Sequence, residues 1–76
     1  MAFREIVAPT VKELFIQQLE GMILSGELAF GEQLPPAREL AAKMGVSRTV
    51  VTAGLVELEK LGFVEIKARQ GVYVCD

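Results

Sequence analysis

Apolar residues recur along the first third of the chain at the spacing of one helical face. Counted from Val11, apolar residues lie three, four and eight positions further along the chain, which is typical of an amphipathic helix. Gly26 follows, and a glycine there lets a helix end in a left-handed turn. We therefore expect a helix that ends before Gly26 and buries Val11, Leu14, Phe15, Leu19, Met22 and Ile23.

Two further helical patterns follow, separated by a tight turn. Pro36 suits the start of a helix over residues 37–44, which Gly45 ends. Ser47 is a candidate N-cap of a third helix over residues 48–61, because its hydroxyl can accept a hydrogen bond from a backbone N–H of the next turn. Two helices separated by about three residues that include a glycine are typical of the helix-turn-helix unit.

The rest of the chain predicts a connector and a hairpin. Residues 27–34 indicate a connector, and we expect its Leu28 and Phe30 to fold back onto the core. After the third helix the pattern changes to that of strands, over residues 63–67 and 72–75. A β-hairpin therefore follows the third helix.

These elements predict a mainly α fold with a small β-hairpin, namely a winged helix-turn-helix of three helices and a two-stranded wing. The 76 residues can hold one domain. We place this domain at residues 10–76, behind an N-terminal arm at residues 1–9. A chain of this size buries only about 60% of its unfolded surface, so much of its sequence must serve folding.

The composition excludes most catalytic and metal sites. The chain has no His and one Cys, so it can form neither a zinc set of soft ligands nor an internal disulfide. Histidine is also the commonest general base, and no Ser, Cys or Lys has an activating partner at helical spacing. We therefore expect no enzyme, no catalytic residue, no cofactor and no metal, and we interpret Cys75 as a strand residue.

The chain also lacks the sequence features of membrane and secreted proteins. No run of residues approaches the ~18 apolar positions of a membrane span. The N-terminus has no basic segment followed by a long apolar core, as a secretory signal would. We expect a cytoplasmic protein with no membrane partner.

The third helix separates into two faces at about 100° per residue. One face gathers apolar residues and a glycine, and we expect it to face the core. The opposite face gathers small or short polar side chains, so it could approach a duplex closely, and a major groove admits such a helix. Taken singly, each residue of this second face is equally well interpreted as an ordinary solvent-facing position. The core set is Val51, Gly54, Leu55 and Leu58, and the opposite set is Thr49, Thr52, Ala53 and Val56.

Arginines at two helix starts are candidate DNA ligands. Arg48, next to Ser47, opens the third helix, where backbone N–H groups and a guanidinium together suit a phosphate or a guanine edge. Arg38 lies near the start of the second helix, the element that crosses the DNA backbone in helix-turn-helix docking. The alternative for Arg38 is a surface ion pair, for instance with Glu39 or Glu57.

The predicted hairpin tip offers a second candidate contact. Arg69, Gln70 and Gly71 combine a long cation, an amide and a flexible residue, which suits a minor groove or a phosphate. A solvated turn is the alternative interpretation.

The net charge is −2, from 10 acidic and 8 basic residues, although a domain that binds DNA through its backbone is expected to be basic. The charge is unevenly distributed, however. Residues 1–33 contain 5 acidic and 2 basic side chains, whereas residues 36–55 contain 3 basic and 1 acidic. We therefore expect modest affinity, a shallow dependence on salt and help from dimerisation.

Short motifs follow one another in a fixed order between about residue 11 and residue 74. They are GEQLP at residues 31–35, RELA at 38–41, GVSRT at 45–49, LE at 58–59, LGFV at 61–64 and GVYV at 71–74. This ordered set resembles the DNA-binding domain of GntR-type bacterial transcription regulators, and most closely its FadR-like branch.

The resemblance implies a role for several of these residues. Arg38 would contact the DNA backbone, Ser47, Arg48 and Thr49 would open the recognition helix, and Gly71 would belong to a wing that enters the minor groove. Such regulators normally continue into a C-terminal domain that binds a metabolite and dimerises the protein. We therefore expect this chain to be part of a longer homodimer that reads a palindromic operator.

The chain departs from the family pattern in three places. Pro36 stands where Ser is usual, Thr52 and Ala53 stand where Arg followed by Glu or Gln is common, and the wing tip has one glycine, Gly71, where two are frequent. Loss of the serine removes an N-cap worth ~1 kcal/mol.

The leading hypothesis is sequence-specific binding of double-stranded DNA. The alternative is a winged-helix module that binds another protein through its apolar patches, since winged helices also serve as docking folds. The two differ in salt dependence, because DNA binding weakens as ionic strength rises and an apolar contact hardly responds.

Overall fold

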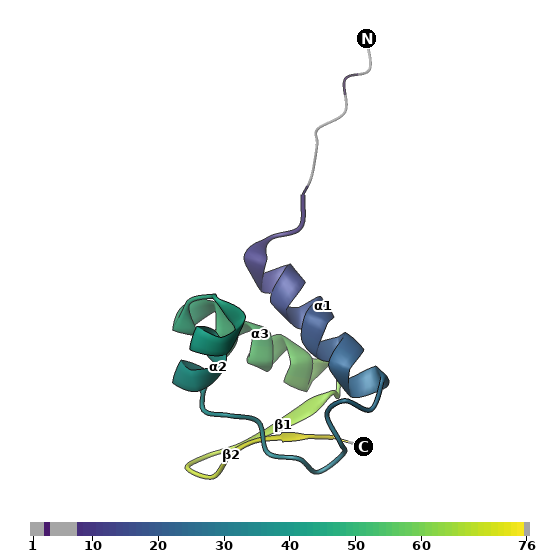
Figure 1. Ribbon diagram of the computed structural model, residues 1–76, viewed down its shortest axis with the longest axis vertical. Coiled ribbons are helices and arrows are strands. Elements are labelled where there is room, and N and C mark those ends of the chain that lie inside the picture. Colours follow the sequence, from purple (N-terminus) through teal and green to yellow (C-terminus); the bar gives the residue numbers. More distant parts are fainter. Residues whose placement is uncertain (1–2, 4–7, 76) are drawn as a thin grey trace.

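The computed structural model describes residue 3 and residues 8–75, and it contains three helices followed by an antiparallel hairpin (Figure 1). Helix α1 crosses α3, α2 lies beside the start of α3, and the hairpin covers the other side of the helices. The predicted winged helix-turn-helix is confirmed. Most of the predicted arm at residues 1–9 lies outside the described residues, as does Asp76. The elements are α1 (Val11–Leu24), α2 (Ala37–Met44), α3 (Arg48–Lys60), β1 (Val64–Lys67) and β2 (Gly71–Val74).

Local hydrogen bonds explain where α1 begins and where α2 ends, whereas the start of α2 has no side-chain cap. Thr10 forms a capping box, in which its hydroxyl accepts from the Glu13 N–H at 3.1 Å and the Glu13 carboxylate accepts from the Thr10 N–H at 3.5 Å. Pro36 occupies the N-cap of α2, where its ring offers no hydroxyl to the first turn. Gly45 ends α2 at φ 68, and the Val46 N–H donates to the Ala41 carbonyl at 3.1 Å.

The buried face of α1 is rotated from the predicted one. Ile16, which the predicted stripe omits, is buried together with Phe15, Leu19 and Ile23. These four positions centre on Leu19, and at 100° per residue Leu14 lies roughly 140° from that centre. Leu14 is accordingly 51% exposed, and Val11, at the first position of the helix, is 53% exposed, so the prediction that both are buried was wrong.

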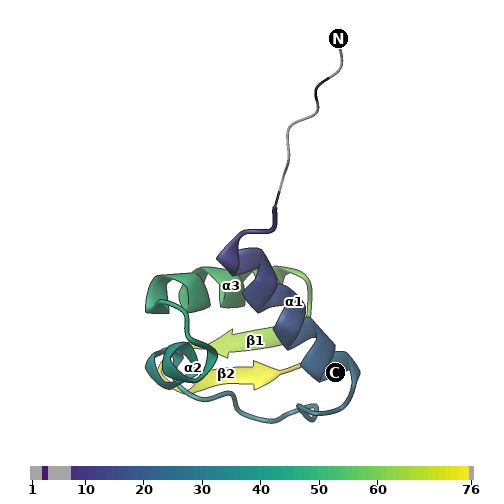
Figure 2. The same ribbon diagram turned by 45° about the horizontal axis from the view of Figure 1, so that its top comes forward.

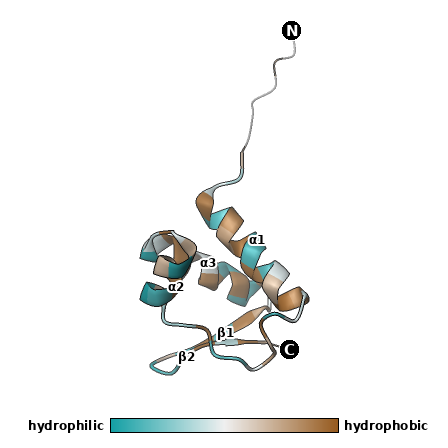
Figure 3. Cartoon of the chain, in the orientation of Figure 1, coloured by the Kyte–Doolittle hydropathy of each residue, from teal (hydrophilic) through white to brown (hydrophobic). Residues whose placement is uncertain are grey.

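The core lies between the helices and the hairpin, and Figure 3 shows that hydrophobic and hydrophilic positions alternate along α1. The face of α3 predicted to be internal is buried, which confirms that prediction. Val64 and Val74, which pair across the hairpin, close the core on the strand side. The buried residues are Phe15, Ile16, Leu19, Ile23, Leu34, Leu40, Ala41, Val51, Leu55, Leu58, Val64 and Val74.

The connector between α1 and α2 runs along the outer side of β2 (Figure 2). The N–H groups of Gly31 and Leu34 donate to carbonyls of β2 at 2.8 Å, and the Val74 N–H donates to the carbonyl of Glu32 at 2.9 Å. The sequence predicted only a loop here. Leu28 packs against the core as expected, but Phe30 is 62% exposed, because the bonds to β2 hold this part of the connector at the edge of the hairpin.

Candidate nucleic-acid interface

The turn between α2 and α3 positions the start of the third helix. The Ser47 hydroxyl accepts from the Val50 N–H at 3.1 Å, so Ser47 is the N-cap that the sequence predicted. This bond leaves other N–H groups of the first turn, next to Arg48 and Thr49, without partners inside the helix. Ser47, Arg48 and Thr49 are all exposed. The first turn of α3 therefore presents donors to solvent, as an anion site requires.

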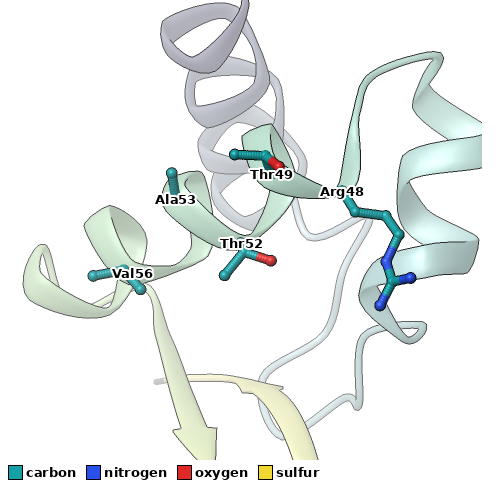
Figure 4. Close-up of a pocket in the computed structure, with 5 residues that line it drawn as sticks. All are labelled: Arg48, Thr49, Thr52, Ala53 and Val56. Carbon is teal, nitrogen blue, oxygen red and sulfur yellow. The ribbon is translucent and has the colours of Figure 1, made fainter.

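The exposed side of α3 forms a wide, open surface pocket (Figure 4). Most of the side chains that line it are short. Two threonine hydroxyls, the methyl group of Ala53 and the Val56 side chain follow one another along the helix. Arg48 extends from the first turn, away from this row. The structure thus brings together the four residues that helical periodicity assigned to the outer face with Arg48, the separate candidate at the start of the helix. The lining residues are Arg48, Thr49, Thr52, Ala53 and Val56.

The ion pairs considered for Arg38 do not form within the described residues. Glu39 lies 3.9 Å from Lys43, and Glu57 lies 3.7 Å from Lys12. Arg38 is exposed in the first turn of α2. Its guanidinium is therefore available to an external anion, and its role as a phosphate ligand stays a prediction.

The wing tip is a tight turn with two residues at positive φ. Arg69 adopts φ 64 and Gly71 φ 126, and the Gln70 N–H donates to the Lys67 carbonyl at 3.1 Å. Arg69 and Gln70 are exposed. The first strand begins one residue later than predicted, at Val64, and the second lies one residue earlier, so Gly71 begins β2 and Cys75 lies just beyond its end, not in the strand as expected. The tip therefore presents a cation and an amide outward, as the sequence suggested.

A surface groove joins the wing tip to the start of α2. Its lining includes Arg69, Gln70 and Gly71 on one side and residues 34–37 on the other. Gln33 also lines it, and its side-chain amide donates to the Gln70 carbonyl at 2.9 Å. Sequence reasoning missed Gln33, because no local pattern connects it with a turn 37 positions away. The candidate residues of the wing and of α2 consequently lie on neighbouring parts of the surface.

No helix described within residues 8–75 has the length and hydropathy that a transmembrane span requires.

Known regulators are similar to this chain in sequence and in fold. Residues 10–74 match the family described as "Bacterial regulatory proteins, gntR family". The Uxu operon transcriptional regulator of Escherichia coli is 50% identical over 46 residues, which are 60% of this chain and 18% of that protein. The Uxu operon regulator of Haemophilus influenzae is 45% identical over 58 residues, which are 76% of this chain and 22% of that protein. The chain thus spans about a fifth of the length of these relatives.

Two solved structures show the same arrangement. A transcriptional regulator from Oenococcus oeni has a TM-score of 0.89 over 97% of this chain and 62% of its own, and its 19% identity supports the fold alone. YtrA from Sulfolobus acidocaldarius, a GntR-family transcription factor, has a TM-score of 0.78 at 28% identity, over 100% of this chain and 64% of its own. The match over residues 10–74 covers nearly the whole winged helix-turn-helix. The chain therefore belongs to the GntR family of bacterial regulatory proteins, as a DNA-binding domain of a transcription regulator.

Proposed function

We propose that this domain reads double-stranded DNA in a sequence-specific manner, with α3 in the major groove and the wing at the minor groove. The observation that carries the proposal is the outer face of α3, where short side chains follow an exposed arginine at the N-terminus. Short side chains let a helix backbone approach the base edges closely, and the major groove is wide enough to admit it.

The proposed contacts follow from the chemistry of each side chain. Arg48 donates to a phosphate or to O6 and N7 of a guanine, and the Thr49 and Thr52 hydroxyls bind phosphates or base edges. Ser47 supports the site through the helix N-terminus, since its hydroxyl already accepts from Val50. Arg38 binds a backbone phosphate from the first turn of α2.

The wing is proposed to bind beside the recognition helix. Arg69 and Gln70 reach into the adjacent minor groove or to its phosphates, and Gly71 lets the backbone approach. The groove between the wing tip and the start of α2 places the wing next to the element that carries Arg38, which supports one continuous DNA-binding surface.

We further propose that the full-length regulator is a cytoplasmic homodimer that reads a palindromic operator. The net charge of −2 limits how much one domain gains from phosphates alone. Two domains on a two-fold operator would combine their contacts, with half-sites one helical turn, about 34–36 Å, or a multiple of that apart.

The proposal is tested by enrichment of bound duplexes from a random pool at low salt. Three proteins are compared: the wild type, the Arg38→Ala, Arg48→Ala double variant, and a control double variant, Lys12→Ala, Lys60→Ala. The control removes the same positive charge from outside residues 36–55, at the first turn of α1 and the last turn of α3. Lys12 forms a surface ion pair with Glu57, and such a pair contributes only about 0–1 kcal/mol to stability, so the control should fold.

We expect the wild type and the control to enrich one motif and the arginine variant to lose it. Affinity for that motif should fall as salt rises, with a shallow slope. No enrichment by the wild type, even when it is fused to a dimerising domain, would overturn the proposal. Equal enrichment by the arginine variant would remove Arg38 and Arg48 from the interface.

A further inference from the structure

The tip of the wing adopts a conformation that its own sequence does not favour. Arg69 has φ 64, in the left-handed region, where a side chain with a Cβ crowds the following carbonyl oxygen. Such a conformation persists when surrounding contacts offset its cost. The contacts around the tip therefore decide where the Arg69 guanidinium is held.

One of these contacts comes from outside the hairpin. The Gln33 Nε2 group donates to the carbonyl oxygen of Gln70 at 2.9 Å, so the residue that follows Arg69 is held by the connector. The Tyr73 hydroxyl reaches the same oxygen at 3.4 Å. The Gln70 carbonyl oxygen therefore accepts both hydrogen bonds, and the bond from Gln33 is the shorter one.

The side chain of Gln33 also fits the glycine that follows. A Cβ built on Gly71 would stand 2.6 Å from Gln33 Nε2, so the amide occupies the space that another side chain would need. Gly71 additionally has φ 126. The glycine of the wing and the glutamine of the connector are thus complementary in shape.

The position of Gln33 itself does not depend on this side-chain bond. Its main chain lies opposite Tyr73, and the neighbouring N–H of Leu34 donates to the Val72 carbonyl at 2.8 Å. The Gln33 side chain is exposed, and exposed hydrogen bonds add little to global stability because water competes for both groups. Its effect is therefore expected on the local shape of the tip.

We propose that Gln33 is a positioning residue for the wing: its side-chain amide holds the Gln70 carbonyl, and thereby fixes the tip in the conformation that directs Arg69 toward DNA. This inference rests on the proposed function. Gln33 acts through Arg69 and makes no base contact of its own.

The test combines Gln33→Met with Arg69→Asn in a double-mutant cycle on the enriched duplex. Methionine keeps the length of the glutamine and removes the donor. Asparagine removes the positive charge and tolerates a left-handed backbone. Gln17→Met, at an exposed position of α1, is the matched control, and Gln33→Asn, which is one methylene too short to reach, is a second variant at the same site.

We expect Gln33→Met and Gln33→Asn to weaken DNA binding by about 2- to 10-fold, the range that one hydrogen bond supports. In the Arg69→Asn background the same changes should have no effect. Residual dipolar couplings of the Arg69 and Gln70 amides in the free protein should change in both Gln33 variants and not in Gln17→Met. Unfolding temperatures should stay the same.

Two results would overturn the inference. An equal loss of affinity in both backgrounds would mean that Gln33 acts independently of Arg69. Unchanged couplings at the tip would mean that the amide does not hold it. If the wild type enriches no duplex, the proposed function fails, and the couplings of the free protein still decide whether Gln33 fixes the tip.

Discussion

Gly54 lies on the buried side of α3, directly against the ring of Phe15 in α1. A Cβ at this position would overlap Cδ2 of that ring and stand 2.6 Å from Cε2, well inside the ~3.5–4.0 Å of a carbon contact. Phe15 is only 2% exposed and lies within the core cluster, so its ring can move away from Gly54 only by displacing core neighbours. We predict that Gly54→Ala destabilises the domain.

Two opposing effects determine the magnitude. Replacing a glycine by alanine inside a helix stabilises it by ~1 kcal/mol, whereas overpacking a core costs ~1–3 kcal/mol. Gly21 in α1 isolates the first effect, because a Cβ built there meets no heavy atom of the described chain within 4 Å. The difference in unfolding free energy between Gly54→Ala and Gly21→Ala should therefore be about 2 kcal/mol, the middle of the overpacking range.

Urea and thermal unfolding followed by far-ultraviolet circular dichroism measure this difference. In a domain of this size 1 kcal/mol shifts the midpoint by about 4–8 °C, so the two variants should differ by roughly 8–16 °C. The wild type should lie between them. If Gly54→Ala were as stable as Gly21→Ala, the ring of Phe15 would not cover Gly54, and the described packing of α1 on α3 would be wrong.

Three further predictions concern two helix caps and one hydrogen bond between α3 and β1. Ser47→Ala should lower the free energy of unfolding by ~1 kcal/mol through loss of the N-cap bond. Its control, Ser25→Ala at the C-cap of α1, should lower this free energy by less. Equal losses for the two variants in urea unfolding would contradict the assignment of Ser47 as the N-cap. Gly45→Ala should cost ~1–2 kcal/mol because of the φ of 68, and a variant at least as stable as the wild type would refute this. Glu59→Ala should speed amide hydrogen exchange at Ile66, whose N–H donates to the Glu59 carboxylate at 2.8 Å, and unchanged exchange would show that this bond protects nothing.

The helix boundaries near the turn were predictable because their causes are local. Ser47 caps the helix that it precedes, and Gly45 ends the helix that it follows, so α2 was predicted at its observed bounds. The outer face of α3 was predictable for a similar reason. Helical periodicity alone sorts a short helix into two faces, whatever packs against it.

The rotation of α1 was not predictable in the same way. Leu14 and Ile16 are both apolar, and they lie on opposite sides of the helix face that contains Phe15 and Leu19. Which one is buried depends on where α3 lies, and that is set by contacts distant in sequence. The prediction chose Leu14, and the structure buries Ile16.

The pairing of the connector with β2 was also not predictable from the local sequence. Residues 27–34 carry no strand periodicity, yet residues 31–34 bond to β2. Backbone groups form these bonds, so the side-chain pattern holds little information about them. The hydrogen bond from Gln33 to the wing tip depends on that pairing and was missed with it.

The pairing of the connector with β2 also affects how the protein behaves when it is concentrated. A two-stranded ribbon has two open edges, and unpaired backbone groups on such edges recruit strands from other molecules. Here the connector occupies the outer edge of β2, and the Glu59 carboxylate accepts an outward N–H of β1 at Ile66. Glu65 and Lys67 add charges along β1, which discourages association further. The small sheet is thereby protected from edge-to-edge aggregation on both sides, by the main chain of the connector beside β2 and by the side chains of Glu59, Glu65 and Lys67 beside β1.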